Sequence, residues 1–116
     1  MIEGRGGTAR SGPARHERPV IDEAALVAAR AGDRLLAAAQ DAGDERWTSY
    51  FAPLPDRLRD ESLGDLRRTV MRARSAYGPK DSVRDALPPE ATEPFLDALD
   101  RLLKALNRRD VTEDRG

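Results

Sequence analysis

The sequence predicts an all-α fold: a small helical bundle of three main helices and one or two short helices, preceded by a disordered N-terminal tail. Apolar residues recur at helical spacing in three separate segments, and runs of strand-forming residues are absent. The chain of 116 residues has room for one domain. We therefore expect a tail at residues 1–20, a bundle at 21–108 and a frayed C-terminus at 109–116.

The strongest helical pattern lies between Thr92 and Asn107, with Thr92 as the expected N-cap. One stripe, roughly 120° wide, collects the apolar residues of this segment: Phe95, Leu96, Leu99, Leu102, Leu103 and Leu106. The opposite side carries two acid–base pairs spaced four residues apart, Asp97 with Arg101 and Asp100 with Lys104. This helix must bury its stripe, either within the chain or in a homodimer.

The first main helix is predicted from Asp22 to Ala42, with Asp22 as its cap. Gly43 follows the helix, where a left-handed residue commonly ends one. The inner face consists mostly of Ala, with Gly32 at its edge. Another helix can therefore approach this face closely.

The second main helix is predicted to start near Asp60 to Ser62 and to end at Tyr77, with Gly78 as its left-handed end. Its narrow apolar stripe has the spacing of helix-on-helix packing: Leu63, Leu66, Val70, Ala73 and Tyr77. A short helix over residues 81–87 then has an acidic cap and two inward apolar residues, Asp81, Val83 and Leu87.

An aromatic cluster falls within residues 44–54. Its members have the spacing of one helix face: Trp47, Tyr50, Phe51 and Leu54. Pro53 and Pro55 limit how far that helix can continue. The favoured interpretation is that these side chains fill the core. The alternative is that they anchor a protein partner, because Trp and Tyr dominate binding hot spots.

Residues 65–84 carry a local net charge of +4. The basic residues of this block are Arg67, Arg68, Arg72, Arg74, Lys80 and Arg84. A basic helix of this kind could lie along a nucleic-acid backbone. The favoured interpretation is a solvated or ion-paired face, in which Arg67 and Arg74 pair with acids of residues 85–107.

Residues suited to catalysis or metal binding are scarce. The chain has no Cys, and its one His, His16, falls in the predicted tail. The carboxylates lack the Glu-x-x-His and Asp-x-Asp spacings of metal sites. We therefore predict no enzyme, no cofactor and no metal. No apolar run reaches the roughly 18 residues of a membrane span, and no signal peptide is recognisable, so we expect a soluble cytoplasmic protein.

Two features bear on the origin of the chain. Lys occurs only at positions 80 and 104, and this strong preference for Arg is typical of GC-rich bacterial genomes. Residues 2–5, Ile-Glu-Gly-Arg, match a protease site often placed in expression vectors. Both a native and a vector-derived start therefore remain open for residues 1–5.

Three short segments of the chain are similar to those of a known kind of domain: Ala42-Gly43-Asp44-Glu45-Arg46-Trp47, Tyr77-Gly78 and Ser82-Val83-Arg84-Asp85. In this order, over about residues 35–87, the chain resembles a small bacterial α-helical domain family of unknown function. The resemblance implies that the middle of the chain belongs to one domain, and it implies no activity.

Amphipathic helices and an aromatic cluster without reactive residues favour a non-enzymatic protein–protein interaction module, such as an adaptor, a regulator or an immunity-type binder. Its partner would be another protein or a second copy of the chain. The alternative is a nucleic-acid-binding regulator that uses residues 67–84.

Overall fold

A computed structural model describes residues 15–115, which form helices and no strand. The all-α prediction is therefore confirmed for this part of the chain. Predicted tail residues 1–14 lie outside the described residues. The elements are the 3₁₀ helix η2 (Arg15–Glu17), α1 (Pro19–Asp41), α2 (Glu45–Phe51), α3 (Leu54–Asp60), α4 (Leu63–Arg74), the 3₁₀ helix η3 (Ser75–Tyr77), α5 (Val83–Ala86) and α6 (Pro89–Arg115).

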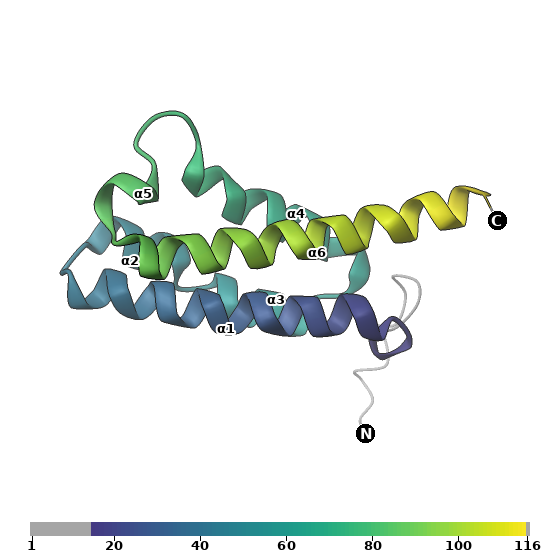
Figure 1. Ribbon diagram of the computed structural model, residues 1–116. Coiled ribbons are helices and arrows are strands. Elements are labelled where there is room, and N and C mark those ends of the chain that lie inside the picture. The colour runs from purple at the N-terminus through teal and green to yellow at the C-terminus, as the bar shows by residue number, and fades with distance from the viewer. Residues whose placement is uncertain (1–14, 116) are drawn as a thin grey trace, which may run out of the picture.

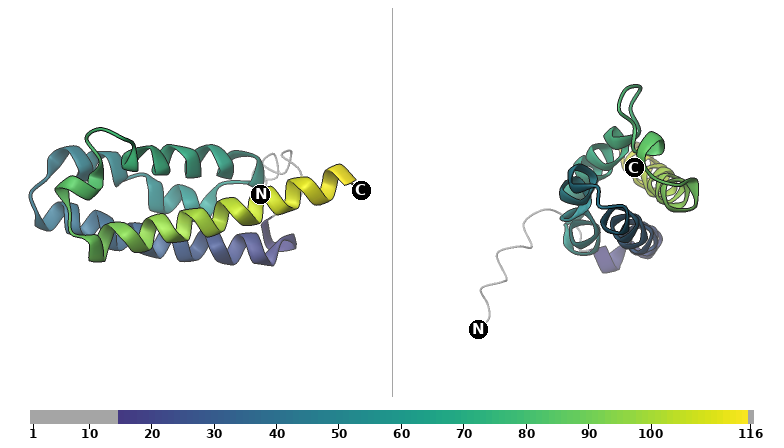
Figure 2. Two further views of the ribbon diagram at one scale, coloured as in Figure 1. Left: turned by 45° about the horizontal axis from the view of Figure 1, so that its top comes forward. Right: turned by 90° about the vertical axis from the view of Figure 1, so that its left-hand side faces the viewer.

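The two long helices, α1 and α6, run antiparallel and side by side (Figure 1). α2 and α3 follow one another along α1, and α4 packs against both α3 and α6. Viewed from the end, these helices are grouped around a common axis (Figure 2), and their buried side chains form one core. α2 and α3 together occupy the place of one helix, which makes the fold a four-helix arrangement with one interrupted member.

Pro53 explains the interruption between α2 and α3. The sequence predicts Leu54 on the same helix as Trp47, but α2 ends at Phe51 and Leu54 begins α3. The backbone N–H that proline lacks cannot continue the α2 ladder, whereas Pro55 is tolerated in the first turn of α3. The sequence did not predict α3 as a separate helix.

The C-terminus of α1 has the predicted left-handed glycine, with φ of +68° at Gly43. The N–H groups of Gly43 and Asp44 each donate a 3.0 Å hydrogen bond to carbonyls of the last α1 turn, on Gln40 and Ala39. These two bonds form a Schellman motif. Asp44 then caps α2 by accepting a 3.0 Å bond from the Trp47 N–H.

The other predicted left-handed end is wrong. α4 ends at Arg74 and continues as η3, and Gly78 has an extended backbone with φ of −63° and ψ of 179°. The residue with positive φ in this connection is Asp81, at 53°. Consequently Ser82, rather than Asp81, caps α5 by accepting a 3.0 Å bond from the Arg84 N–H.

Both long helices begin earlier than the sequence predicts. α1 starts at Pro19, so Asp22 lies in its first turn instead of capping it. α6 starts at Pro89, so Thr92 is not its cap but a fully buried residue inside the helix. Proline at the first helical position suits both starts because its missing N–H would have no helical partner there. At the other end, α6 extends to Arg115, beyond the bundle boundary predicted at 108 and through the segment predicted to fray, and its last turns project from the bundle (Figure 1).

The core confirms most of the predicted helix faces. The α4 stripe buries Leu63, Leu66, Val70 and Ala73, and α5 turns Val83 and Leu87 inward. The α6 stripe buries Phe95, Leu99, Leu102 and Leu106 within the chain, while Leu96 and Leu103 of the same stripe stay partly exposed. Gly32 lies where α1 meets the Phe95 ring: a Cβ added to Gly32 would lie 3.0 Å from Phe95 Cε1.

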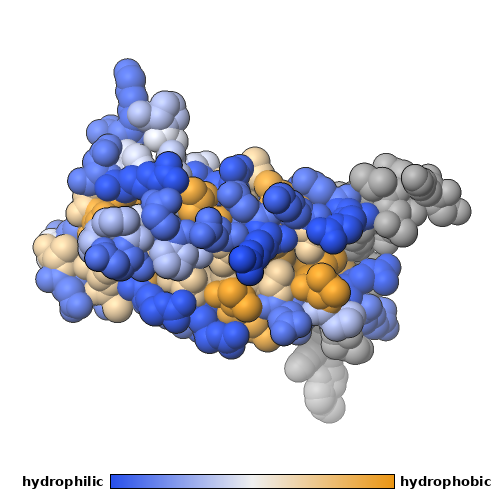
Figure 3. Space-filling model, in the orientation of Figure 1, coloured by the Kyte–Doolittle hydropathy of each residue, from blue (hydrophilic) through white to orange (hydrophobic). Residues whose placement is uncertain are grey.

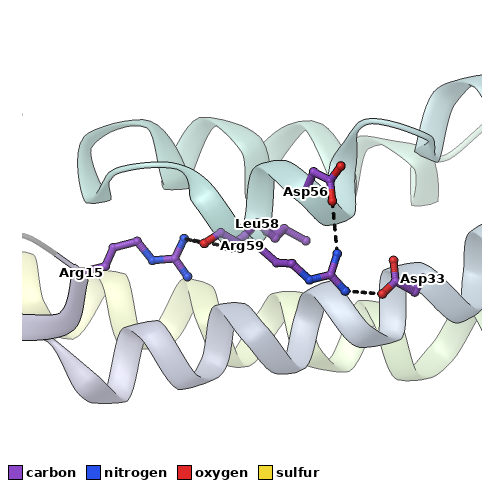
Figure 4. A network of polar contacts seen from close by, with 5 residues as sticks. All are labelled: Arg15, Asp33, Asp56, Leu58 and Arg59. Atoms are coloured by element: carbon purple, nitrogen blue, oxygen red, sulfur yellow. Dashed lines mark hydrogen bonds and ion pairs between the residues drawn. The ribbon is translucent and has the colours of Figure 1, made fainter. Parts of the chain in front are cut away.

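The predicted tail is too long at its C-terminal end. Arg15 lies on η2 with a side chain only 10% exposed, and its Nη2 pairs with Asp22 at 2.9 Å. Its guanidinium reaches the end of α3, as Figure 4 shows. Residues 15–20 are therefore part of the folded domain.

Candidate interaction surface

The predicted partner-binding cluster of Trp47, Tyr50, Phe51 and Leu54 belongs mainly to the core. Trp47 is 4% exposed, and Phe51 and Leu54 are fully buried. The Phe51 ring centroid lies 5.6 Å from that of Trp47 and 5.9 Å from that of Phe95 on α6. These rings therefore join α2 to α6, and the interpretation of the cluster as core, left open by the sequence, is the one that their burial supports.

Tyr50 is the one half-buried member of this cluster. Its hydroxyl donates a 2.6 Å hydrogen bond to the carbonyl of Arg72 on α4. The Arg72 guanidinium lies 5.6 Å from the Tyr50 ring centroid, within the range of a cation–π contact. Tyr50 thus connects α2 to α4 rather than offering a free aromatic face.

Three of the basic residues in the 67–84 block make contacts with α6. Arg74 Nε donates a 2.8 Å bond to Asp100, as the sequence predicts for a cross-helix pair. Arg67 instead donates a 2.6 Å bond to the amide oxygen of Asn107. Asp100 is therefore held by Arg74 on another helix and not by Lys104, its predicted partner on α6.

Arg84 joins α5 to α6. Its guanidinium donates two bonds of 2.9 Å to the Glu93 carboxylate and lies 5.6 Å from the Tyr77 ring centroid. The bonds from Arg84 lower the pKa of Glu93, whereas burial, followed by the nearby Glu93 charge, raises the pKa of Tyr77. The Tyr77 hydroxyl donates a 2.5 Å bond to the carbonyl of Thr92.

The remaining basic residues of the block, Arg68, Arg72 and Lys80, are exposed. Arg68 is 84% exposed and lies 3.9 Å from the Asp65 carboxylate. The six predicted nucleic-acid-binding residues therefore divide into two groups. Arg67, Arg74 and Arg84 bond to residues of α6, although the Arg84 side chain is still 49% exposed, and the other three are exposed residues.

A surface that the sequence did not predict lies between α4 and α6. These helices run antiparallel, and the Arg67–Asn107 and Arg74–Asp100 contacts set a register in which Met71 faces Leu103. Met71 is 47% exposed and Leu103 is half-buried. Leu96, two turns before Leu103, is also half-buried. We call Met71, Leu96 and Leu103 the α4–α6 surface.

In the sequence, only the position of Met71 around the α4 helix indicates this surface. It falls outside the α4 stripe of buried residues, where an apolar side chain has no core to enter. Leu96 and Leu103 give no such signal, because they lie within the predicted α6 stripe. Their partial exposure follows from the width of that stripe, which exceeds what α1 and α4 cover.

Two further features are absent from residues 15–115, the described part of the chain. Within this range, no three or more His, Asp or Glu side chains gather in a way that could hold a metal ion. None of the helices in the described part of the chain combines the length and apolar content needed to cross a bilayer. Comparisons with protein-family models, with curated proteins and with solved structures found no match.

Proposed function

We propose that the chain is a non-enzymatic protein–protein interaction module that holds another protein on the α4–α6 surface. The observation that carries this proposal is the 47% exposure of Met71, at the position that the Arg67–Asn107 and Arg74–Asp100 contacts align with Leu103. Most of the apolar residues of α4 and α6 enter the core, whereas Met71 is exposed and Leu103 is only partly buried at the edge of the core. An adaptor, a regulator or an immunity-type binder would each fit this proposal.

The composition of the surface supports binding to a protein. Protein interfaces have an apolar centre surrounded by polar groups, and Met is enriched in them because its flexible thioether adapts to a partner's shape. Here Met71 and Leu103 lie between the Arg67–Asn107 and Arg74–Asp100 contacts. Covering each half-exposed apolar side chain would stabilise a complex by about 1 kcal/mol.

The two flanking contacts also support a surface that exists before the partner arrives. Each one joins α4 to α6, so the distance between Met71 and Leu103 is set within the free chain. A preformed surface loses less conformational entropy on binding than one that must be ordered.

The test is capture of a partner from a lysate of the source cells, with and without nuclease. We expect a protein that is retained after nuclease treatment and lost with Met71→Glu or Leu103→Glu. Ser49→Glu, which adds the same charge at an exposed position on α2, is the matched control and should retain capture. Equal capture by all of these variants would contradict the proposal.

Nuclease treatment separates this proposal from nucleic-acid binding. If all captured material disappears with nuclease, and Arg68→Ala and Arg72→Ala reduce a steeply salt-dependent binding, the exposed basic residues carry the function instead. A protein partner whose capture depends on Met71 and survives nuclease supports the interaction module.

A further inference from the structure

The outer face of α1 carries two exposed valines. Val20 is 69% exposed and Val27 is 41% exposed, and they are spaced seven residues apart on the same side of the helix. Ala24, between them, is half-buried. In Figure 3 the face that includes α1 and α6 has separate apolar patches among charged side chains. The α1 face is distinct from the α4–α6 surface.

The charged residues of α1 divide according to the side on which they lie. Asp22 pairs with Arg15, and Asp33 pairs with Arg59 of α3. The exposed residues beside the valines are Glu23, Arg30 and Arg34. Among the ion pairs within residues 15–115, none involves these three residues. Between Val20 and Arg34 the outer face therefore has an acid in its N-terminal half and two bases in its C-terminal half, and the exposed acid Asp41 lies beyond this stretch, in the last turn of α1.

We propose that the α1 outer face, formed by Val20, Glu23, Val27, Arg30 and Arg34, binds the same face of a second copy of the chain in antiparallel orientation. A twofold axis near Val27 would place position 23 of one copy opposite position 31 of the other. At a rise of about 1.5 Å per residue, Glu23 then lies within reach of Arg30 or Arg34 of the second copy.

The charge pattern favours a second copy of the chain as the partner, and it favours the antiparallel orientation. An antiparallel pair brings the acidic half of each α1 against the basic half of the other, and a twofold interface uses each complementary contact twice. A parallel pair would place like charges together. Because one helix face buries little area, the dimer should be weak and concentration-dependent.

Sedimentation velocity of the full chain over a wide range of concentrations tests the proposal. We expect a monomer–dimer equilibrium. Val27→Asp should raise the dissociation constant about tenfold or more, because it places a charge at the centre of the apolar contact. Ser49→Glu, on α2, should leave the constant unchanged. Circular dichroism of each variant checks that the helices are retained.

Charge reversal gives the sharper test. Glu23→Arg alone, or Arg30→Glu with Arg34→Glu, should weaken self-association because each places like charges together across the twofold axis. Mixing these two variants should restore a dimer, since both contacts become complementary in the heterodimer. A monomer at every concentration would overturn the proposal. A dimer whose dissociation constant is unchanged by the charge reversals would also overturn it, as would a dimer that is weakened by Met71→Glu instead.

Discussion

Nη1 of Arg15 donates a 2.8 Å hydrogen bond to the carbonyl of Leu58, across 43 residues of sequence. The same nitrogen reaches the carbonyls of Arg59 at 2.8 Å and Glu61 at 3.1 Å (Figure 4 shows the approach to α3). The last carbonyls of a helix have no partner within it, so this guanidinium completes the end of α3. A helix of seven residues needs such contacts, because one so short is unstable alone.

Arg15→Ala should lower the free energy of unfolding by about 2 kcal/mol, because it leaves carbonyls at the end of α3 without a donor and Asp22 without its partner. Arg15→Lys should recover only part of this, since an ammonium cannot reproduce the planar set of donors. Urea denaturation measures both. Arg57→Ala, at an exposed position of α3, is the control. A loss equal to that of the control would show that Arg15 does not support α3.

Gly32→Ala should destabilise the fold although alanine favours helix. The gain in helix propensity is about 1 kcal/mol at most. Against it, the new Cβ would lie 3.0 Å from Cε1 of Phe95, a fully buried ring in contact with Phe51. Overpacking of this kind costs about 1–3 kcal/mol. Urea denaturation should therefore show a lower free energy of unfolding for Gly32→Ala. This loss should be smaller when Gly32→Ala is combined with Phe95→Leu in a double variant. A net gain would mean that the ring moves freely.

Gly43 and Gly64 should respond to alanine in opposite directions. Gly43 has φ of +68°, where a Cβ costs about 1–2 kcal/mol, so Gly43→Ala should lower the thermal midpoint. Gly64 is exposed in α4 and has no positive φ. Gly64→Ala should therefore raise the free energy of unfolding by about 0.5 kcal/mol, because alanine lowers the conformational entropy of the unfolded chain. Calorimetry of the two variants checks the contrast, and equal effects would argue against the Schellman motif at Gly43.

Tyr77 should make the fold sensitive to alkali. Burial raises its pKa, with Glu93 adding to the rise, so the folded state favours the neutral phenol. The resulting stability is fully present below the unfolded tyrosine pKa of about 10 and is lost as the pH rises above it. Tyr77→Phe should cost about 1 kcal/mol at neutral pH, through the lost bond to Thr92, and should flatten the alkaline decline. Urea midpoints across this pH range measure both effects, and parallel declines would refute them.

The sequence predicts the features of this fold that depend on neighbouring residues. Leu99 and Val70 fall on their predicted buried faces because helical spacing alone determines them. The left-handed backbone of Gly43 is predictable because helices commonly end at a glycine with positive φ. Gly78 fails the same rule because α4 tightens into η3 before reaching it, which leaves the positive φ to Asp81.

Features that depend on tertiary register were not predictable. Nothing near Arg15 in the sequence indicates Leu58 as its partner, and a basic residue in a Gly-rich segment resembles a solvated tail. Met71 and Leu103 likewise become a pair only when the contacts of Arg67 and Arg74 align α4 with α6. Local pattern thus identifies core faces, while the candidate surface emerges from packing.

Met71 offers the most direct measurement of partner binding, because the only other Met is Met1. Mass spectrometry can follow oxidation of the Met71 thioether by peroxide in the free chain and in the complex captured from lysate. A 47% exposed thioether should oxidise readily when free and be protected when a partner covers the α4–α6 surface. Equal oxidation rates in the free and bound chain would contradict binding at that surface.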